Sequence, residues 1–300
     1  MMPRMHSRME LRGTLRLDEP LAWHTSWRVG GPADRYYEPA DLEDLAQFMR
    51  SLSEDEPVYW IGLGSNLLIR DGGVRGTVLC LSGRLSRLEQ TSDGCVRGEA
   101  GVACAKLARF CVQHGFSGAE FLAGIPGTVG GALAMNAGAS GGETWGIVEA
   151  VETMDRHGEI RIRTPSDYRI AYRSVAGPVG EWFVAGRFRL VPGAVAEGKA
   201  LIKSLLARRG ATQPTRQPNA GSVFRNPPGD YAARLIEATG LKGLCDGDAC
   251  VSDLHANFII NRGQATAAQI ERLIALVQQR VLAAQGIKLE PEVRIMGVES

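Results

Sequence analysis

Residues 123–139 read AGIPGTVGGALAMNAGA, and this stretch decides how the rest of the chain is interpreted. Five of its residues are glycines, which surround the fixed ring of Pro126. Successive backbone N–H groups that no side chain blocks can form a concave nest that binds an anion. A pyrophosphate suits such a nest better than a packed core does. The stretch therefore predicts part of a nucleotide-binding site.

The same region resembles a membrane span in one respect, because no charge occurs between Phe121 and Gly142. A spanning helix needs about 20 predominantly apolar residues. Here seven glycines, Pro126 and Asn136 take the place of large apolar side chains. We therefore predict a Gly–Ala loop region in this part of the chain and no membrane span.

A second glycine loop, GLGSN at residues 62–66, follows an apolar run at 58–61 that predicts a buried strand. A dinucleotide fingerprint would need a glycine where Leu67 stands, and the chain has no phosphate loop ending in Gly-Lys-Ser/Thr. Alone, the loop is explained equally well as a tight turn. Both loops precede a boundary predicted near Pro192 and Gly193, so one ligand can bridge them. Together they favour a nucleotide cofactor.

Length and composition limit the class of protein. At roughly 150 residues per domain, 300 residues predict about two domains or three small ones. The formal net charge of +1 argues against a protein held mainly by nucleic-acid phosphates or anionic lipid. Nineteen of the 37 glycines fall between Gly62 and Gly146, so the glycine excess is local to the two loops and their surroundings.

No two of the six cysteines have the spacing of a zinc site or a redox dithiol. They are Cys80, Cys95, Cys104, Cys111, Cys245 and Cys250. The basic N-terminus has no apolar run of the kind that a secretory leader contains. We therefore expect reduced, mostly buried cysteines, no metal site and a cytoplasmic location.

Apolar periodicity and capping residues predict a mixture of helices and strands. The clearest helix runs over 266–285, with a capping box at Thr266 and Gln269. Its apolar stripe consists of Ile270, Leu273, Ile274, Val277, Val281 and Leu282. Further helices are expected at 41–50, 104–114, 198–209 and 231–239, and strands at 58–61, 78–81, 148–154 and 159–163, the last two as a hairpin. Because helices and strands do not alternate strictly, the pattern favours an α+β fold.

Eight motifs in order along the chain resemble the UDP-N-acetylenolpyruvoylglucosamine reductase (MurB) family. The amino half contributes the loop at 123–139, TSWRVGG (25–31) and GLGSNLLIRDGG (62–73). The carboxyl half contributes AYRS (171–174), QPNAGSVFRNP (217–227), LKG (241–243), SDLHANFIIN (252–261) and PEVR (291–294). The resemblance extends over nearly the whole chain, from about 21 to 297.

The resemblance implies an FAD-binding fold of the vanillyl-alcohol-oxidase type, built from two α+β subdomains, with a C-terminal α+β substrate domain. We place the subdomains at 1–86 and 87–195 and the substrate domain at 196–300. The resemblance further implies that NADPH reduces non-covalently bound FAD. It also implies that the enolpyruvyl ether of UDP-N-acetylglucosamine is then reduced to UDP-N-acetylmuramate, a peptidoglycan precursor. The small-molecule partner is therefore a nucleotide sugar.

The resemblance also assigns residues to the cofactor and to catalysis. The cofactor-binding residues are Arg28, Gly62, Gly64, Ser65, Asn66, Leu67, Gly124, Ile125, Pro126, Gly127, Val129, Gly130, Gly131, Asn136 and Gly138. Arg173 matches the catalytic arginine, which can hold a carboxylate by two N–H bonds. Ser222 matches the proton donor, and Glu292 matches the catalytic glutamate. By sequence alone, these three would be a surface arginine, a turn serine and a solvated carboxylate.

Tyr172, Arg225 and Asn226 are implied to contact the substrate, where a basic side chain suits a diphosphate. For His255, which lies in a family motif, we expect a structural role. Some members of the family carry an extra loop whose tyrosine closes over the substrate. Only 48 residues separate Arg173 from Ser222 here, none of them tyrosine, so the chain resembles the shorter subclass and its substrate cover is open.

Two other functions compete with this interpretation. A flavin-dependent oxidase of the same fold would account for both glycine loops, although not for the AYRS, GSVFRNP and PEVR motifs. A nucleotide-binding module without catalysis would use the loops for UDP or a similar ligand. The colour of the protein separates them, because a flavoprotein is yellow and bleaches with a reductant.

Overall fold

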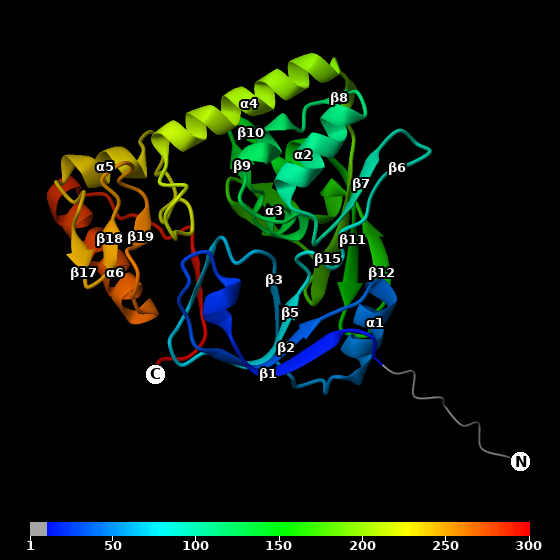
Figure 1. Ribbon diagram of the computed structural model, residues 1–300, viewed down its shortest axis with the longest axis horizontal. Coiled ribbons are helices and arrows are strands. Elements are labelled where there is room, and N and C mark those ends of the chain that lie inside the picture. The colour runs from blue at the N-terminus through cyan, green and yellow to red at the C-terminus, as the bar shows by residue number, and fades with distance from the viewer. Residues whose placement is uncertain (1–10) are drawn as a thin grey trace, which may run out of the picture.

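In the computed structural model, which describes residues 11–300, the first part of the chain forms a four-stranded sheet in the order β1-β2-β5-β3 (Figure 1). β1 is antiparallel to β2, whereas β2 and β3 are parallel to β5. The elements are β1 (Thr14–Pro20), the short helix η1 (Leu21–His24), β2 (Pro32–Glu38), α1 (Leu42–Ser51), β3 (Val58–Ile61) and β5 (Val74–Cys80).

Local sequence signals determine the helix of this region. The Asp41 side chain accepts a hydrogen bond from the N–H of Asp44 and so caps α1, the helix predicted at 41–50. Leu45 and Phe48 on its inner face are fully buried. Strand β3 has the predicted bounds, whereas the strand predicted at 78–81 begins earlier, at Val74. Arg75 and Gly76 interrupt the apolar run there, so the pattern alone hides the start of the strand.

The second sheet is five-stranded and antiparallel, in the order β12-β11-β15-β7-β6. Its predicted hairpin, β11 with β12, is confirmed. One face packs against α2 and α3, where Val151, Phe188, Leu107 and Leu133 are buried together. The elements are β6 (Leu88–Gln90), β7 (Val96–Glu99), α2 (Cys104–Gln113), η2 (Glu120–Gly124), α3 (Val129–Met135), η3 (Thr144–Ile147), β11 (Val148–Asp155), β12 (Ile160–Arg163) and β15 (Glu181–Phe188).

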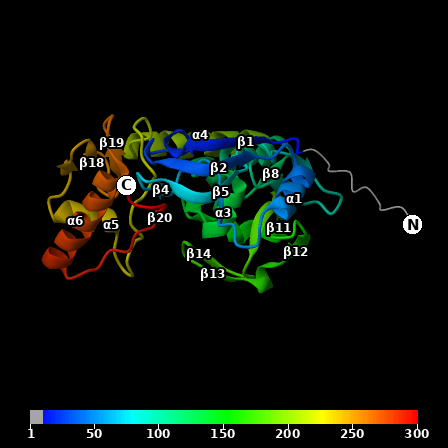
Figure 2. The same ribbon diagram turned by 90° about the horizontal axis from the view of Figure 1, so that it is seen from below.

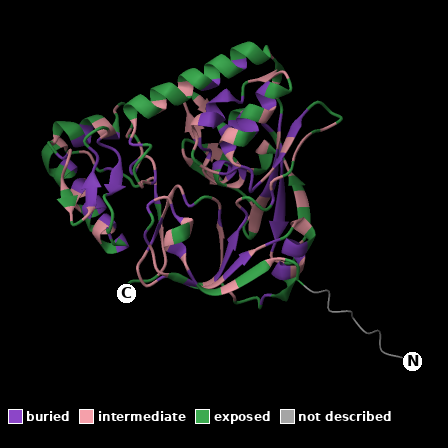
Figure 3. Cartoon of the chain, in the orientation of Figure 1, coloured by how far each residue is buried: buried purple, intermediate pink, exposed green. Residues whose placement is uncertain are grey.

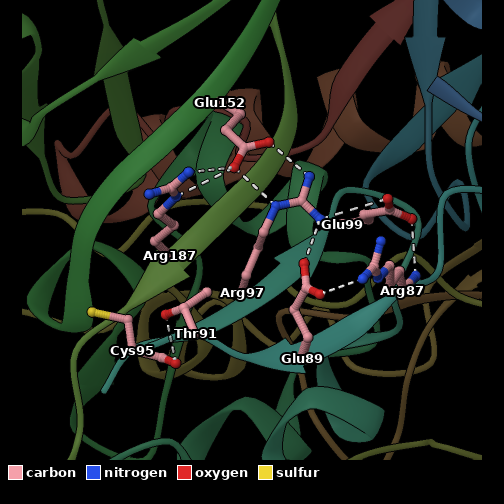
Figure 4. Close-up of polar contacts among 8 residues, drawn as sticks. All are labelled: Arg87, Glu89, Thr91, Cys95, Arg97, Glu99, Glu152 and Arg187. Carbon is pink, nitrogen blue, oxygen red and sulfur yellow. Dashed lines mark hydrogen bonds and ion pairs between the residues drawn. The ribbon is translucent and has the colours of Figure 1, made fainter. Parts of the chain in front are cut away.

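The opposite face of this sheet carries a network of ion pairs (Figure 4). Glu152 lies between two arginines and is 9% exposed as a side chain. Its oxygens accept hydrogen bonds of 2.7 and 2.8 Å from Arg97 and of 3.2 and 3.3 Å from Arg187. Glu89 and Glu99 lie 3.5 and 3.6 Å from the same Arg97 guanidinium. Opposite charges therefore hold this face together, both between adjacent strands and, for Arg97 and Glu152, across the intervening strand β15.

The prediction of a Gly–Ala loop region between Phe121 and Gly142 is wrong in part, because Val129–Met135 is the helix α3. The Thr128 hydroxyl accepts from the N–H of Gly131 at its start, and Asn136 ends it in the left-handed conformation. Helix α3 has few large side chains, and its Val129 and Leu133 are buried against α2 and the second sheet. Tertiary packing thus forms a helix that its glycines disfavour locally.

The third region contains the remaining long helices and a small antiparallel sheet, β17-β18-β19. The capping box of Thr266 and Gln269 in α6 is present as predicted, and Gly286 ends the helix. Leu282 is 48% exposed, so its predicted place in the buried stripe is wrong. The elements are α4 (Val195–Thr212), α5 (Ala232–Ala238), β17 (Cys245–Asp246), β18 (Ala249–Val251), β19 (Ile259–Asn261), α6 (Ala267–Gln285) and β20 (Arg294–Met296).

Helix α4 differs from its predicted extent at both ends. It begins at Val195 and continues through Gly210 to Thr212 instead of ending at Arg209. The predicted helix at 231–239 is confirmed as α5. The remaining short elements are β4 (Leu67–Ile69), β8 (Phe116–Ser117), β9 (Gly138–Ala139), β10 (Gly142–Glu143), η4 (Pro165–Asp167), β13 (Arg169–Ala171), β14 (Ser174–Ala176) and β16 (Val191–Pro192).

The C-terminal strand returns to the region of the first glycine loop. Strand β20 pairs in parallel with β4, which follows the GLGSN loop, and Figure 2 shows the two side by side near the C-terminus. Trp27 is buried in the core formed by α5 and α6. Its indole N–H donates to the carbonyl oxygen of Ile259 at 2.7 Å, and the Asn261 amide donates to its carbonyl oxygen at 2.9 Å. The motifs around Trp27 and Asn261 therefore form one structural unit.

The cysteines correct one prediction. Cys80, Cys95, Cys104 and Cys111 are free and buried, as expected. Cys245 and Cys250 form a disulfide, so the expectation that all six are reduced is wrong. The reason is structural, because the two residues are direct partners on β17 and β18 of one hairpin. Among the described residues, no helix is long and apolar enough to cross a membrane.

Candidate active site

A cavity of about 300 Å³ lies where the three regions meet. Its wall combines parts of both glycine loops, the β13–β14 turn, the C-terminal half of α4 and the segment before β20. The predicted site residues that line it are Ser65, Asn66, Gly124, Ile125, Pro126, Gly138, Arg173, Ser222 and Glu292. All three predicted catalytic residues therefore share one cavity.

Arg173 stands in the tight turn between β13 and β14, with a left-handed backbone at φ +53°. Its Nε donates to Oε1 of Glu292 at 3.0 Å. Its two terminal nitrogens donate to the carbonyl oxygens of Asn136 at 3.3 Å and of Gly138 at 2.9 Å. The guanidinium is thus fixed by three partners. Tyr172 is 44% exposed, and its ring centroid lies 5.0 Å from the Arg173 guanidinium carbon.

Glu292 is held by its backbone as well as by Arg173. Its N–H donates to the carbonyl oxygen of Val223 at 2.7 Å, and its carbonyl oxygen accepts from the Asn66 amide at 3.1 Å. Its side chain is 11% exposed. Burial raises the pKa of the Glu292 carboxyl, and this effect exceeds the opposing attraction of Arg173 and Arg225. Glu292 consequently retains a proton more readily than an ordinary glutamate.

Ser222 faces the cavity from a segment that Asn257 clamps. The carbonyl and side-chain oxygens of Asn257 accept from the N–H groups of Val223 and Phe224, both at 2.9 Å. Its amide donates back to the carbonyl oxygen of Phe224 at 2.8 Å. Within the described residues, the Ser222 hydroxyl forms no hydrogen bond, so it is available to a ligand. We did not identify Asn257 from the sequence, although it lies in the SDLHANFIIN motif.

Arg225 and Asn226 lie outside the cavity wall. Arg225 donates to the carbonyl oxygen of Arg173 at 3.2 Å, and its Nε is buried without a hydrogen-bond partner in the described part of the chain. The side-chain oxygen of Asn226 accepts from the N–H of Ala232 at 3.1 Å, at the start of α5. Neither residue therefore lines the cavity, and Arg225 supports the backbone of Arg173.

A second cavity of about 350 Å³ adjoins the first and shares Ser65, Pro126, Arg209 and Gly221 with it. Arg28, another predicted cofactor residue, lines only this second cavity. Five arginines contribute to the two walls, against a single carboxylate, that of Glu292. These arginines are Arg28, Arg173, Arg208, Arg209 and Arg216. The combined site is therefore suited to a ligand with several negative charges.

The backbone of the GLGSN loop fits a pyrophosphate. Gly64 has φ +60°, and a Cβ there would overlap the carbonyl oxygen of His24, so only glycine is accommodated. Among the described residues, the N–H groups of residues 63–66, Gly127 and Thr128 donate to no protein atom. Such unpaired donors in two glycine loops are what an anion nest requires.

Other predicted cofactor residues support the two loops from behind. The N–H groups of Val129 and Gly130 donate to the carbonyl oxygens of Val102 at 2.8 Å and Ala100 at 2.9 Å, and that of Gly131 to the Thr128 hydroxyl. Gly62 packs against Thr128, and Leu67 begins β4. The Asn136 amide bridges Glu143 and Ala171 at 2.9 and 3.2 Å. These residues line neither cavity, since their groups are used by the protein itself.

His255 has the structural surroundings that the sequence suggested. Its Nδ1 lies 3.3 Å from the N–H of Asn257, and its ring packs edge-on against Phe258. Burial lowers the pKa of the His255 imidazole. It therefore stabilises the segment that also holds the clamp residue Asn257.

Two family models match the chain. One, described as an FAD binding domain, matches residues 33–163. The other, described as the C-terminal domain of UDP-N-acetylenolpyruvoylglucosamine reductase, matches residues 213–296. The α+β architecture, the anion-binding loops and the shared cavity thus define a flavin-dependent oxidoreductase with a C-terminal substrate domain.

Similar proteins identify the family. A UDP-N-acetylenolpyruvoylglucosamine reductase from Methylococcus capsulatus is 62% identical over 286 residues, which is 95% of this chain and 94% of the relative. One from Alkalilimnicola ehrlichii is 59% identical and covers 95% of both chains. The crystal structure of the reductase (MurB) from Thermus caldophilus is 34% identical with a TM-score of 0.81, covering 95% of this chain and 99% of that one. The chain belongs to the UDP-N-acetylenolpyruvoylglucosamine reductase family.

Family membership confirms the fold class predicted from the sequence, an FAD-binding fold of the vanillyl-alcohol-oxidase type followed by an α+β substrate domain. FAD is accordingly the cofactor, and NADPH is its reductant. The unpaired N–H groups of the two glycine loops are the part of the structure that fits the FAD pyrophosphate.

Proposed function

We propose that this protein reduces the enolpyruvyl group of UDP-N-acetylglucosamine enolpyruvate to give UDP-N-acetylmuramate in peptidoglycan precursor synthesis. It is an FAD-dependent oxidoreductase that uses NADPH. The observation that carries the proposal is the meeting of Arg173, Glu292 and Ser222 in one cavity beside the anion-binding loops. Because the reductant is NADPH and the substrate a nucleotide sugar, we place the reaction in the cytoplasm.

The chemistry requires a hydride at the terminal vinyl carbon, stabilisation of the charge that develops toward the carboxylate, and a proton at the adjacent carbon. The bound flavin supplies the hydride. Arg173 binds the substrate carboxylate, since a fixed guanidinium stabilises developing negative charge without reorganising. Its three protein contacts hold it in place for that role.

Ser222 donates the proton. A serine hydroxyl is a weak acid, so it needs a strongly basic acceptor such as an enolate and a polarising neighbour. Its hydroxyl forms no hydrogen bond with the described residues, and the Asn257 clamp fixes the backbone immediately after it. Glu292 completes the enolate-binding group. Burial raises the pKa of its carboxyl, while its contact with Arg173 holds the side chain at the cavity wall.

The remaining assignments follow from position. Ser65, Asn66, Gly124, Gly127 and Arg28 contact FAD, while Leu67, Val129, Gly130, Gly131 and Asn136 support those contacts. Tyr172 is exposed beside Arg173 and contacts the substrate. Arg225 and Asn226 act on the substrate mainly by holding the Arg173 turn and the start of α5. The FAD-binding subdomains extend over 1–86 and 87–195, and the substrate domain over 196–300.

An anaerobic absorbance titration of the purified protein tests the proposal. NADPH is expected to bleach the flavin bands, and the enolpyruvyl UDP-sugar is expected to restore them. Recovery with oxygen but not with the sugar would indicate an oxidase of the same fold. A protein that stays colourless even after FAD is supplied would be a nucleotide-binding module.

A further inference from the structure

Helix α4 is anchored at one end only. In its N-terminal half, Gly198 packs against Val112 of α2 and Ile202 is buried in the same core. Beyond Ile202 no residue of the helix is fully buried, although Leu205 and Arg209 are partly buried, and Figure 3 shows the helix largely exposed. The C-terminal half instead borders the catalytic cavity. Its contributions to the wall are Leu205, Arg208, Arg209 and Thr212. This half of α4 therefore covers the site in a chain without a tyrosine loop.

The two arginines in this cover have only neutral partners. Arg208 donates to the Ser140 hydroxyl at 2.7 Å, and Arg209 donates to the side-chain oxygen of Gln213 at 3.2 Å. Among the described residues, neither forms an ion pair with a carboxylate, unlike Arg97 or Arg70, which pair with Glu152 and Glu271. Burial lowers the pKa of Arg209. Two cations thus border the cavity without protein anions to neutralise them.

The cavity offers no other negative charge for them. Glu292 is its only carboxylate, and it is already paired with Arg173. Guanidinium groups match the charge and the oxygen geometry of a diphosphate. Arg209 borders both cavities, whereas Arg208 borders only the one that contains Ser222. A change of Arg208 therefore distinguishes a contact with the substrate from a contact with the flavin.

We propose that Arg208 and Arg209 bind the diphosphate of the nucleotide-sugar substrate, and that the C-terminal half of α4 forms the cover of the substrate site. This assignment rests on the proposed function. Ser140 is a positioning residue, because its hydroxyl fixes Arg208 over the cavity. The two residues are 68 positions apart in the sequence.

The test uses Arg208→Gln in the full-length holoenzyme, with Lys203→Gln as the matched control. Lys203 lies on the exposed side of α4 and lines neither cavity. Arg208→Gln should raise KM for the nucleotide sugar about tenfold or more with little change in kcat, as expected for a lost charge-assisted contact. Its FAD content and its rate of reduction by NADPH should equal those of the wild type. Arg208→Lys should recover part of the affinity.

FAD and NADPH also carry diphosphates, and the separate readouts distinguish them. Loss of FAD, or slower reduction by NADPH with an unchanged KM for the sugar, would overturn the substrate assignment. An unchanged KM with a lowered Tm would assign Arg208 a purely structural role at the C-terminal end of α4. If the wild type itself fails to turn over the sugar, the proposed function fails and this assignment with it. A working wild type with an equally active Arg208→Gln variant removes only the assignment.

Discussion

Nε of Arg173 lies 3.0 Å from Oε1 of Glu292, although the two residues are 119 positions apart in the sequence. Arg173 belongs to the β13–β14 turn, and Glu292 precedes β20, which pairs with β4 beside the GLGSN loop. The ion pair therefore joins three distant segments at one point. It follows that the cavity lined by Arg173, Ser222 and Glu292 exists only when the C-terminal segment has paired with β4.

Replacing Ser222 with alanine should separate the two halves of the reaction. Flavin reduction by NADPH needs no proton from this hydroxyl, so its rate should be almost unchanged. Reoxidation by the enolpyruvyl substrate should slow by orders of magnitude, because the proton donor is missing. Stopped-flow absorbance of the flavin bands measures both steps.

The matched control is Ser204→Ala on the exposed face of α4, where the hydroxyl only bonds the carbonyl oxygen of Leu201. This variant should reproduce the wild type in both steps. An unchanged reoxidation rate in Ser222→Ala would remove Ser222 from the mechanism.

Glu292 should make stability depend on pH with a definite sign. Burial raises the pKa of its carboxyl in the folded state. The folded protein then binds this proton more tightly than the unfolded chain, in which glutamates have a pKa of about 4.3. Its contribution to stability is therefore fully present below that value and is lost as pH rises through the folded pKa.

Glu292→Gln cannot titrate, so the comparison isolates this group. The free energy of unfolding of the wild type minus that of the variant should fall as pH rises from the unfolded value, and then level off above the folded pKa. Urea denaturation over a pH series measures it. A difference that grows with pH would mean that Arg173 lowers the carboxyl pKa more than burial raises it.

Local signals made part of this structure predictable. The capping box of Thr266 and the left-handed Gly286 lie within a few residues of the helix that they delimit, so the bounds of α6 follow from the sequence. Helix α3 was not predictable, because burial against α2 and the second sheet outweighs the low helix propensity of its glycines. Leu282 directly follows the fully buried Val281, so the helix turns it about 100° away from the covered stripe.

The site, too, could be predicted from the sequence only in part. Motifs pointed to Arg173, Ser222 and Glu292, and these residues line one cavity. The clamp residue Asn257 was missed, because its bonds to residues 223 and 224 span 33 sequence positions and leave no local pattern. Arg208 was missed for the same reason. A basic residue near the C-terminal end of a helix is common, and only the fold shows that Arg208 borders the cavity.

Asn136→Ala should destabilise the protein by about 2–4 kcal/mol. The Asn136 side chain bonds Glu143, the carbonyl oxygen of Ala171 and the N–H of Trp145. Its backbone has φ +48°, which alanine adopts at a cost. Asn136→Gly loses the same bonds without the backbone cost, so it should recover about 1 kcal/mol. Urea denaturation of both variants compares them.

The flavin content of Asn136→Gly adds a second readout. If Asn136 only supports the loops, the folded variant should bind FAD in full when it is supplied. A large loss of FAD affinity at temperatures where the variant remains folded would instead make Asn136 a direct cofactor ligand.

The disulfide between Cys245 and Cys250 should contribute modestly to stability. It closes a loop of a few residues within one hairpin, for which the chain-entropy model gives roughly 2 kcal/mol. Cys245 is exposed, so a reductant can reach the bond. A phosphine reductant should lower the Tm of the wild type and leave that of a Cys245→Ser/Cys250→Ser variant unchanged. Two additional reactive thiols in the untreated wild type would contradict the bond.

Glu152 should be among the most important charges for folding and yet be dispensable for the reaction. It is held between Arg97 and Arg187 on the side of the second sheet opposite α2 and α3, and it lines neither cavity (Figure 4). Removing one member of a buried charge network leaves the partners uncompensated, which costs about 3–5 kcal/mol. Glu152→Ala should therefore lower the free energy of unfolding by roughly 3 kcal/mol while the folded enzyme keeps its kcat.

The control and the pH dependence make this prediction specific. Glu149 lies on the same strand in an exposed pair with Arg189, so Glu149→Ala should leave the free energy of unfolding almost unchanged. Burial raises the pKa of Glu152, but Arg97 and Arg187 together hold it below its ordinary value. Because the pKa of Glu152 is lower in the folded protein than in the unfolded chain, its charge stabilises the fold at pH values above about 4.3, the unfolded pKa. This stabilisation is lost as the pH falls through the folded pKa. The free energies of unfolding of Glu152→Ala and Glu149→Ala should therefore converge as the pH is lowered. A loss of stability in Glu152→Ala that stays the same at low pH would show that packing, not charge, accounts for it.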